Sequence, residues 1–196
     1  KSSAWSSYPH QASGSGMGKL YASIDESLAA FLSAQKLFFV ATAPLSAHGH
    51  INLSPKGLDS FRILGPRKVA YLDLTGSGIE THAHTRENGR ITLMFCAFEG
   101  PPKIVRIHGR ARAIEPGMPG FDELAATFPA LPGLRSIIIV EAERISDSCG
   151  YGVPLYRFEG ERSTLIDWAV KKGPQAVRDY QLSKNRLSID ELPGIG

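Results

Sequence analysis

Hydrophobic positions near the start of the chain follow helical spacing. Leu28, Phe31 and Leu32 recur at intervals that place them on one face of a helix. Just before them, Ser23-Ile24-Asp25-Glu26 has the Ser-x-x-Glu spacing of a capping box, in which two side chains satisfy backbone amides at a helix start. The pattern predicts an amphipathic helix over residues 25–35.

After this helix the chain changes to short apolar runs separated by glycine and proline. Short strands with close turn signals favour a barrel or a sandwich over a parallel sheet with crossover helices. The loop Ser46-Ala47-His48-Gly49 predicts a hairpin in which Gly49 adopts a positive φ. The predicted strands are residues 37–44, 50–54, 61–64, 69–75, 91–98, 104–114 and 137–145.

The run at residues 91–98 is apolar on both of its alternating faces. Leu93 and Phe95 share one face, whereas Met94 and Cys96 share the other. A strand that is buried on both faces needs a second layer, which is either a helix or a partner subunit.

Three more helices are predicted, over residues 78–88, 121–128 and 164–185. Proline lacks a backbone N–H and clashes with the preceding helical turn. Gly173-Pro174 is therefore expected to divide the last segment into two helices.

Composition excludes several classes of protein. With 42% hydrophobic and 21% charged residues, the chain of 196 residues reads as one ordinary globular domain. No apolar run approaches the roughly 20 residues of a membrane span, and no signal-peptide pattern opens the chain, so we expect no membrane partner. Cys96 and Cys149 form neither a disulfide framework nor a Cys-x-x-Cys pair, which favours a reducing, cytoplasmic compartment.

The charge pattern excludes nucleic acid as a partner. The formal net charge is only +3, and its lysines and arginines are scattered rather than clustered. Residues 1–16 are rich in serine and glycine, and we interpret them as an expression leader before a native start at Met17.

A small-residue turn between a predicted strand and a predicted helix is the strongest candidate site. Thr75, Gly76, Ser77 and Gly78 follow an apolar strand. At such a turn, unpaired amides, the helix dipole and the absence of bulky side chains together favour a bound phosphate. The alternative is an ordinary helix start, because Ser77-x-x-Glu80 is itself a capping box that would satisfy those amides.

Two cations precede this turn in the sequence. Lys56 lies beside proline and glycine, and Arg62 enters a strand six residues later. Both side chains could face a phosphate or the edge of a flavin ring. The alternative is that both are ordinary surface cations.

Histidine pairs at His48-x-His50 and His82-x-His84 raise the question of a metal site. Helical residues two apart point to nearly opposite sides, so His82 and His84 are not expected to share an ion, and we predict no metal. The sequence instead favours a solvated face for His82.

Two further residues keep two interpretations each. Cys149 is either a reactive thiol near a flavin or a small buried residue at a strand end. Trp168 either packs in a core or interface or covers the edge of a flavin.

Several segments in order resemble the strands of pyridoxamine 5′-phosphate oxidase-like FMN-binding proteins, over roughly residues 37–114. The later segment Ser148-Cys149-Gly150-Tyr151-Gly152-Val153-Pro154, with the helix that carries Trp168, resembles a subgroup distinct from the true vitamin B6 oxidases. The matching segments are Phe38-Phe39-Val40-Ala41-Thr42-Ala43, Asn52-Leu53-Ser54-Pro55-Lys56-Gly57, Val69-Ala70-Tyr71-Leu72-Asp73 and Ile104-Val105-Arg106-Ile107-His108-Gly109-Arg110-Ala111.

The resemblance implies a mainly β fold with peripheral helices: an antiparallel six-stranded split β-barrel that forms a homodimer with FMN at the subunit interface. It divides the chain into a split-barrel domain at residues 17–150 and a C-terminal helical extension at residues 151–196. Thr75, Gly76, Ser77 and Gly78 would lie at the phosphate turn. The implied contacts to the rest of the cofactor are Lys56, Arg62, Ile63, Leu64 and Arg106.

The chain departs from the vitamin B6 oxidases at two places. Gly78-Ile79 stands where those enzymes carry an Arg-Lys pair that grips the FMN phosphate. Two charge-assisted hydrogen bonds of roughly 1.5–3 kcal/mol each would be missing, unless Lys56, Arg62 and the helix end compensate. Arg186-Leu187-Ser188 also lacks the histidine of their C-terminal Arg-x-His pattern.

The resulting hypothesis is an FMN-dependent oxidoreductase that passes a hydride between flavin and a small organic substrate or a nicotinamide donor. In it, Lys56 or Arg106 stabilises negative charge on the reduced flavin, and no general acid or base is assigned. The alternatives are a non-catalytic binding or carrier protein for FMN, a B6 vitamer, haem or another planar ligand, and a structural dimer with an empty cleft.

Overall fold

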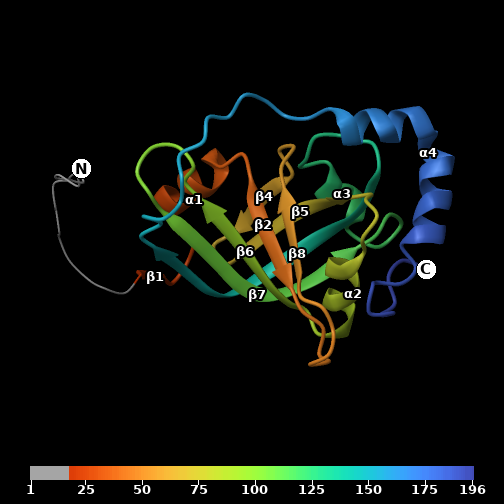
Figure 1. The fold of residues 1–196 in the computed structure, drawn as a ribbon, viewed down its shortest axis with the longest axis horizontal. Coiled ribbons are helices and arrows are strands. Elements are labelled where there is room, and N and C mark those ends of the chain that lie inside the picture. Colours follow the sequence, from red (N-terminus) through yellow and green to blue (C-terminus); the bar gives the residue numbers. More distant parts are fainter. Residues whose placement is uncertain (1–17) are drawn as a thin grey trace, which may run out of the picture.

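The computed structural model describes residues 18–196, so the interpretation of residues 1–16 as a leader lies outside the described residues. An antiparallel sheet of eight strands forms the body, with helices around it (Figure 1). The mainly β split barrel is confirmed, with two strands more than the six expected. The strands are β1 (Leu20–Tyr21), β2 (Phe38–Thr42), β3 (Asn52–Lys56), β4 (Phe61–Gly65), β5 (Lys68–Leu74), β6 (Arg90–Cys96), β7 (Ile104–Ile114) and β8 (Leu134–Ser148). The helices are α1 (Glu26–Ala34), α2 (Glu80–Glu87), α3 (Phe121–Ala125) and α4 (Thr164–Lys184).

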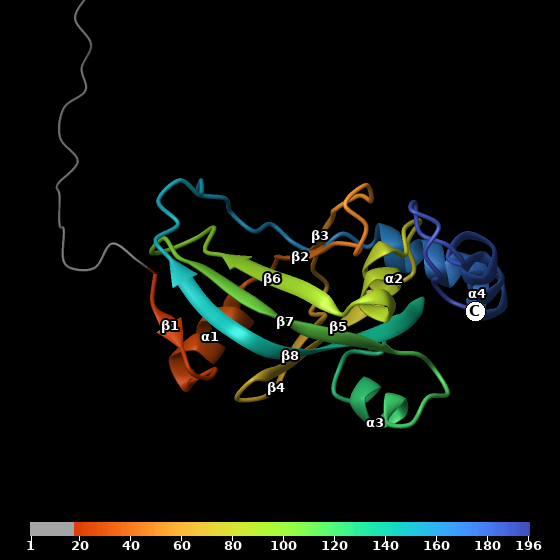
Figure 2. The same ribbon diagram turned by 90° about the horizontal axis from the view of Figure 1, so that it is seen from below.

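The strands pair in the order β3-β2-β6-β7-β8-β5-β4, and β1 adds to β8. β7 and β8 are the longest strands, and β8 curves strongly across the molecule (Figure 2). Their register shifts between His108 and Gly109. A Cβ on Gly109 would lie 2.1 Å from the carbonyl oxygen of Glu141, so only glycine allows β8 to approach this closely.

Two apolar cores lie on opposite faces of the sheet. The larger core fills the barrel, where Phe38 stacks on Phe95 with ring centroids 5.2 Å apart and α1 contributes Leu28 and Leu32. The smaller core contains Leu72 and Ile139 and is covered by the α3 segment. This alternation explains why the central strands are apolar on both faces.

The helix starts differ from the predicted capping boxes. Asp25, not Ser23, caps α1, because the Asp25 carboxylate accepts a hydrogen bond from the Leu28 amide at 2.8 Å. The prediction for α4 is confirmed. Gly173 has a φ of 75° and a ψ of 161°, which interrupts the helical conformation just before Pro174.

The loop between β2 and β3 forms the predicted hairpin, but the expected positive φ of Gly49 is wrong. Glycine is required there by crowding, because a Cβ would lie 2.4 Å from Cγ of Pro44 and 2.9 Å from the Asp190 carboxylate. The same carboxylate accepts a hydrogen bond from the His50 amide at 2.7 Å and joins the C-terminal segment to this loop.

Within residues 18–196, every helix is too short or too polar to cross a membrane.

Candidate active site

The turn that follows β5 is fixed from one side by α4 and β8. The Thr75 amide and hydroxyl both donate to the carbonyl of Gly133, at 2.8 and 2.7 Å. Gln181 of α4 donates to the Thr75 hydroxyl at 2.7 Å. Asn185, the residue that ends α4, donates from Nδ2 to the carbonyls of Gly76 at 3.1 Å and Ser77 at 3.4 Å.

The alternative interpretation of this turn as a capping box is wrong. Ile79, not Ser77, is the cap residue of α2, and no side chain caps the helix. The Glu80 carboxylate instead accepts a hydrogen bond from the Ile189 amide at 3.3 Å. Among residues 18–196, no hydrogen bond has the amide of Gly76, Ser77, Gly78 or Ile79 as its donor.

A buried ion pair lies directly behind the turn. The Arg135 Nε donates to the Asp73 carboxylate at 2.9 Å, and both side chains are at most 5% exposed. Lys56 approaches the other Asp73 oxygen at 3.5 Å from the barrel interior. Burial raises the pKa of Asp73, but Arg135 and Lys56 outweigh it, so the pKa is lowered. The cluster has two cations for one carboxylate.

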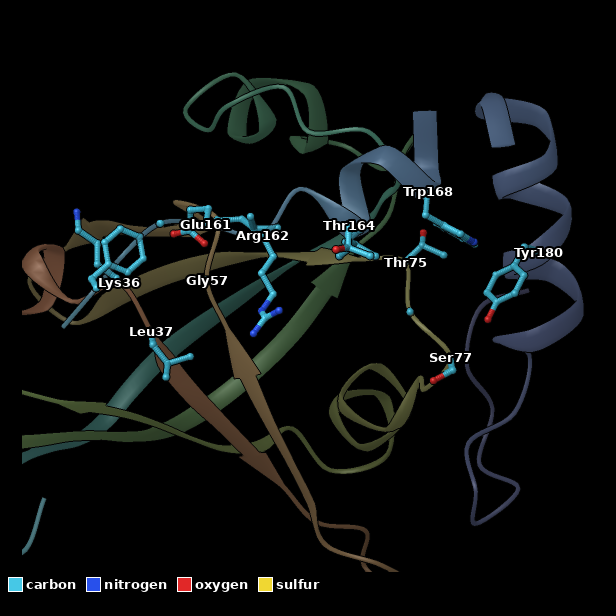
Figure 3. Close-up of a pocket in the computed structure, with 15 residues that line it drawn as sticks. Lys36, Leu37, Gly57, Thr75, Ser77, Glu161, Arg162, Thr164, Trp168 and Tyr180 are labelled. Carbon is cyan, nitrogen blue, oxygen red and sulfur yellow. The ribbon is translucent and has the colours of Figure 1, made fainter. Parts of the chain in front are cut away.

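An open cavity of about 750 Å³ borders the turn. Thr75, Ser77, Trp168 and Tyr180 lie at one end of it, and Lys36 and Glu161 lie at the other (Figure 3). Trp168 and Tyr180 pack edge to face, with centroids 5.2 Å apart. The complete lining is Lys36, Leu37, Gly57, Leu58, Thr75, Gly76, Ser77, Phe158, Gly160, Glu161, Arg162, Thr164, Leu165, Trp168 and Tyr180.

The structure brings together only part of the predicted site. Thr75, Gly76 and Ser77 line the cavity, and Gly78 follows directly in the turn. Lys56 adjoins Gly57 of the lining, but its ammonium faces Asp73.

The remaining predicted residues lie elsewhere in this chain. Arg62 pairs with Asp59 at 2.8 Å and, with Ile63, lines a neighbouring pocket of about 240 Å³. Leu64 packs against the smaller core. Arg106 donates to the Ser148 hydroxyl at 3.0 Å, away from the cavity lining.

Sequence reasoning missed Arg135, Gln181 and Asn185, which fix the turn, and Phe158, Arg162 and Tyr180, which line the cavity. Arg135 is the second residue of β8 and stands just before the apolar run at residues 137–140, and a charge beside a buried run was a usable signal. Gln181 and Asn185 come from a segment about one hundred residues later, and no local pattern pairs them with the turn.

Both histidines of α2 are buried, so the expected solvated face for His82 is wrong. His82 Nε2 lies 3.3 Å from the Glu115 carboxylate, and His84 Nδ1 lies 2.9 Å from the Thr42 hydroxyl. Residues 81–85 of α2 are buried because the helix packs against β2, β6 and β7. No group of three or more His, Cys, Asp or Glu side chains in the described part of the chain is arranged to hold a metal ion.

Acid should weaken the fold through His84. Burial lowers the pKa of His84 below its ordinary 6.5, so the unfolded chain binds this proton more strongly than the folded protein. Stability is therefore full above about pH 6.5 and declines as pH falls below it. Urea unfolding at about pH 7.5 and about 5.5 should show a loss that His84→Gln reduces by about 1 kcal/mol. Equal losses in the two proteins would contradict this assignment.

Cys149 is exposed just after β8, so the interpretation as a buried residue is wrong for this chain. Cys96 is buried, and burial raises its pKa. Trp168 lines the cavity rather than a core. Its ring also contacts the Lys172 ammonium, which lies 5.5 Å from the ring centroid.

Comparisons with known proteins bear on the family and the fold of the chain. The family model of pyridoxamine 5′-phosphate oxidase matches residues 24–149. The chain is 37% identical over 195 residues to pyridoxamine 5′-phosphate oxidase family protein ustO of Aspergillus flavus, covering 89% of this chain and 77% of that protein. A crystal structure of a variant of HupZ from Group A Streptococcus has a TM-score of 0.52 at 23% identity, covering 64% of this chain and 99% of that one. A second HupZ structure gives 0.50 at 24% identity, covering 62% and 91%.

Proposed function

Because the chain belongs to the pyridoxamine 5′-phosphate oxidase family, we propose that it is an FMN-binding oxidoreductase that passes a hydride between flavin and a small organic substrate or a nicotinamide donor. One observation carries the proposal: a turn with unpaired amides opens onto a cavity of about 750 Å³. Cavities of about 300–1,000 Å³ are typical of cofactor and ligand sites.

The residues present fit a phosphorylated planar cofactor. A Cβ on Gly76 would meet no heavy atom within 4 Å, so a phosphate has room to approach the backbone there. The cavity wall is largely apolar and includes Phe158, Trp168 and Tyr180, which suits a flat aromatic ring. The surplus positive charge of Lys56 and Arg135 over Asp73 favours a nearby anion.

Each group of residues has a distinct role in this proposal. FMN itself supplies the redox chemistry by accepting or donating a hydride. The turn at residues 75–79 binds the phosphate, while the aromatic side chains exclude water from the wall that they cover. Lys36 and Arg162 are the cationic side chains of the cavity lining, and they supply positive charge that favours an anionic substrate or a reduced ring.

We further propose that the protein acts as a homodimer. Ile51 is 77% exposed and Leu53 is 64% exposed, on and beside the edge strand β3. Apolar side chains gathered on a sheet edge and its outer face are typical of a surface that a partner covers. The two free cysteines fit a reducing, cytoplasmic compartment.

A second candidate is a non-catalytic protein that binds or carries FMN or another planar ligand. Gly78-Ile79 favours it, because this pair cannot supply the two charged contacts to phosphate that the vitamin B6 oxidases use. The two candidates share the cavity and differ in whether the bound flavin exchanges electrons with a donor.

The absorbance spectrum of the purified protein tests the proposal. We expect visible flavin bands, or bands gained on titration with FMN, that bleach under anaerobic NADH or NADPH. Flavin bands that no nicotinamide donor or candidate substrate bleaches would favour the carrier. The absence of both FMN binding and thermal stabilisation by FMN would contradict both candidates.

A further inference from the structure

Three consecutive peptide carbonyls of the turn are held from behind. Asn185 Nδ2 donates to the carbonyls of Gly76 and Ser77, at 3.1 and 3.4 Å. Arg135 Nη1 donates to the carbonyl of Gly78 at 2.8 Å and to Asn185 Oδ1 at 2.9 Å. The two side chains therefore form one connected unit, which contacts every carbonyl from Gly76 to Gly78.

The geometry of the peptide group determines the direction in which the amides of the turn point. In a trans peptide the C=O and the following N–H point in opposite directions, and the described chain has no cis peptide. Carbonyls drawn towards Asn185 and Arg135 thus direct the amides of Ser77, Gly78 and Ile79 away from them. Thr75, Gly76 and Ser77 line the cavity, whereas Asn185 and Arg135 do not.

We infer that Asn185 and Arg135 are positioning residues that aim these three amides at the phosphate of FMN, an inference that rests on the proposed function. In this arrangement, preorganised backbone amides donate to the phosphate in place of cationic side chains. Asn185 lies beyond residues 24–149, so the chain draws this support from outside the segment that matches the family.

The supporting unit is rigid and buried. Asn185 is 0% exposed, and Arg135 is anchored to Asp73 at 2.9 Å by a different nitrogen from the one that contacts the turn. Arg135 therefore adds positive charge behind the amides, and its guanidinium is held by Asp73 on one side and by the Gly78 carbonyl on the other. The Glu80 carboxylate opposes this positive charge. It lies beside Gly78 and accepts a hydrogen bond from the Ile189 amide.

The test compares FMN with riboflavin, which lacks the phosphate. Kd values for both flavins are measured by fluorescence titration for wild type, Asn185→Ala and the control Ile107→Val. Ile107 of β7 is fully buried in the larger core and does not line the cavity, so its truncation lowers stability without touching α4 or the turn. Asn185→Asp, which keeps the acceptor for Arg135, replaces Asn185→Ala if that variant does not fold.

We expect Asn185→Ala to weaken FMN binding by at least about tenfold while riboflavin binding stays unchanged. Ile107→Val should lower Tm and leave both Kd values unchanged. An equal loss of both flavins in Asn185→Ala, or an unchanged ratio of the two Kd values, would overturn the inference.

A titration with inorganic phosphate separates this inference from the proposed function. In wild type, the NMR amide signals of Ser77, Gly78 and Ile79 should shift with phosphate, and in the Asn185 variant these shifts should disappear. Phosphate-dependent shifts without any FMN binding would refute the proposed function and support the positioning role. Identical shifts in wild type and variant would refute the positioning role alone.

Discussion

Gly76→Asp is expected to lower FMN affinity by at least about 100-fold while changing Tm little. A side chain fits at this position, because nothing lies within 4 Å of the added Cβ and the φ of Gly76 lies outside the left-handed region. The new carboxylate would stand at the mouth of the phosphate turn. Two like charges about 6 Å apart repel by roughly 2–3 kcal/mol at an effective dielectric of 20, which is about 100-fold in Kd.

Gly152→Asp is the matched control for charge and for loss of a glycine. An added Cβ on Gly152 would also meet open space, and this residue does not line the cavity. Its substitution should leave the Kd for FMN unchanged. Calorimetric titration of both variants checks the prediction, and similar affinities in the two would mean that the phosphate binds away from Gly76.

Arg135→Leu is expected to cost about 3–5 kcal/mol of unfolding free energy. The substitution leaves the Asp73 carboxylate 1% exposed, with Lys56 at 3.5 Å as its remaining ion-pair partner and the Ser136 hydroxyl as a hydrogen-bond donor at 3.2 Å. It also removes the donor to the Gly78 carbonyl and to Asn185. Urea denaturation measures the loss, and the double variant Asp73→Asn/Arg135→Leu should recover part of it, because no buried carboxylate then remains without its guanidinium, while the 20% exposed Lys56 side chain still reaches water.

The pH dependence supplies a second readout of the same pair. In wild type the pKa of Asp73 is lowered from 3.8, so the stability from this carboxylate is present above pH 3.8 and is lost as pH falls through the lower, folded value. Without Arg135, burial dominates and the pKa of Asp73 should rise, so acid unfolding begins at a higher pH. A loss below about 1 kcal/mol with an unchanged acid transition would contradict the buried ion pair.

Local sequence patterns predicted most of the fold, because hydrophobic periodicity and turn-forming residues depend on only a few neighbouring positions. The seven predicted strands all correspond to strands of the sheet, and Gly173-Pro174 interrupts α4 as expected. Only β1 was missed, because its two residues pair with β8 through a contact more than one hundred residues away. The family suggested by the ordered motifs is confirmed.

The site was predictable only where it is local. The turn from Thr75 to Gly78 is contiguous, so its composition alone was enough to predict it as a candidate site. Asn185 and Arg135 were not identified, because their roles depend on which segment packs behind the turn. Capping was misassigned at Ser77 because the Ser-x-x-Glu spacing fits a helix start, while Glu80 turns instead to the Ile189 amide. The roles of Lys56, Arg62 and Arg106 toward a cofactor stay predictions.

A crystal structure of the protein with FMN tests the central claim most directly. We predict that the FMN phosphate accepts hydrogen bonds from the amides of Ser77 and Gly78, with Asn185 still bonded to the carbonyls behind them. A phosphate bound at Arg62 or Arg106 instead, with the amides of the turn facing solvent, would contradict the account.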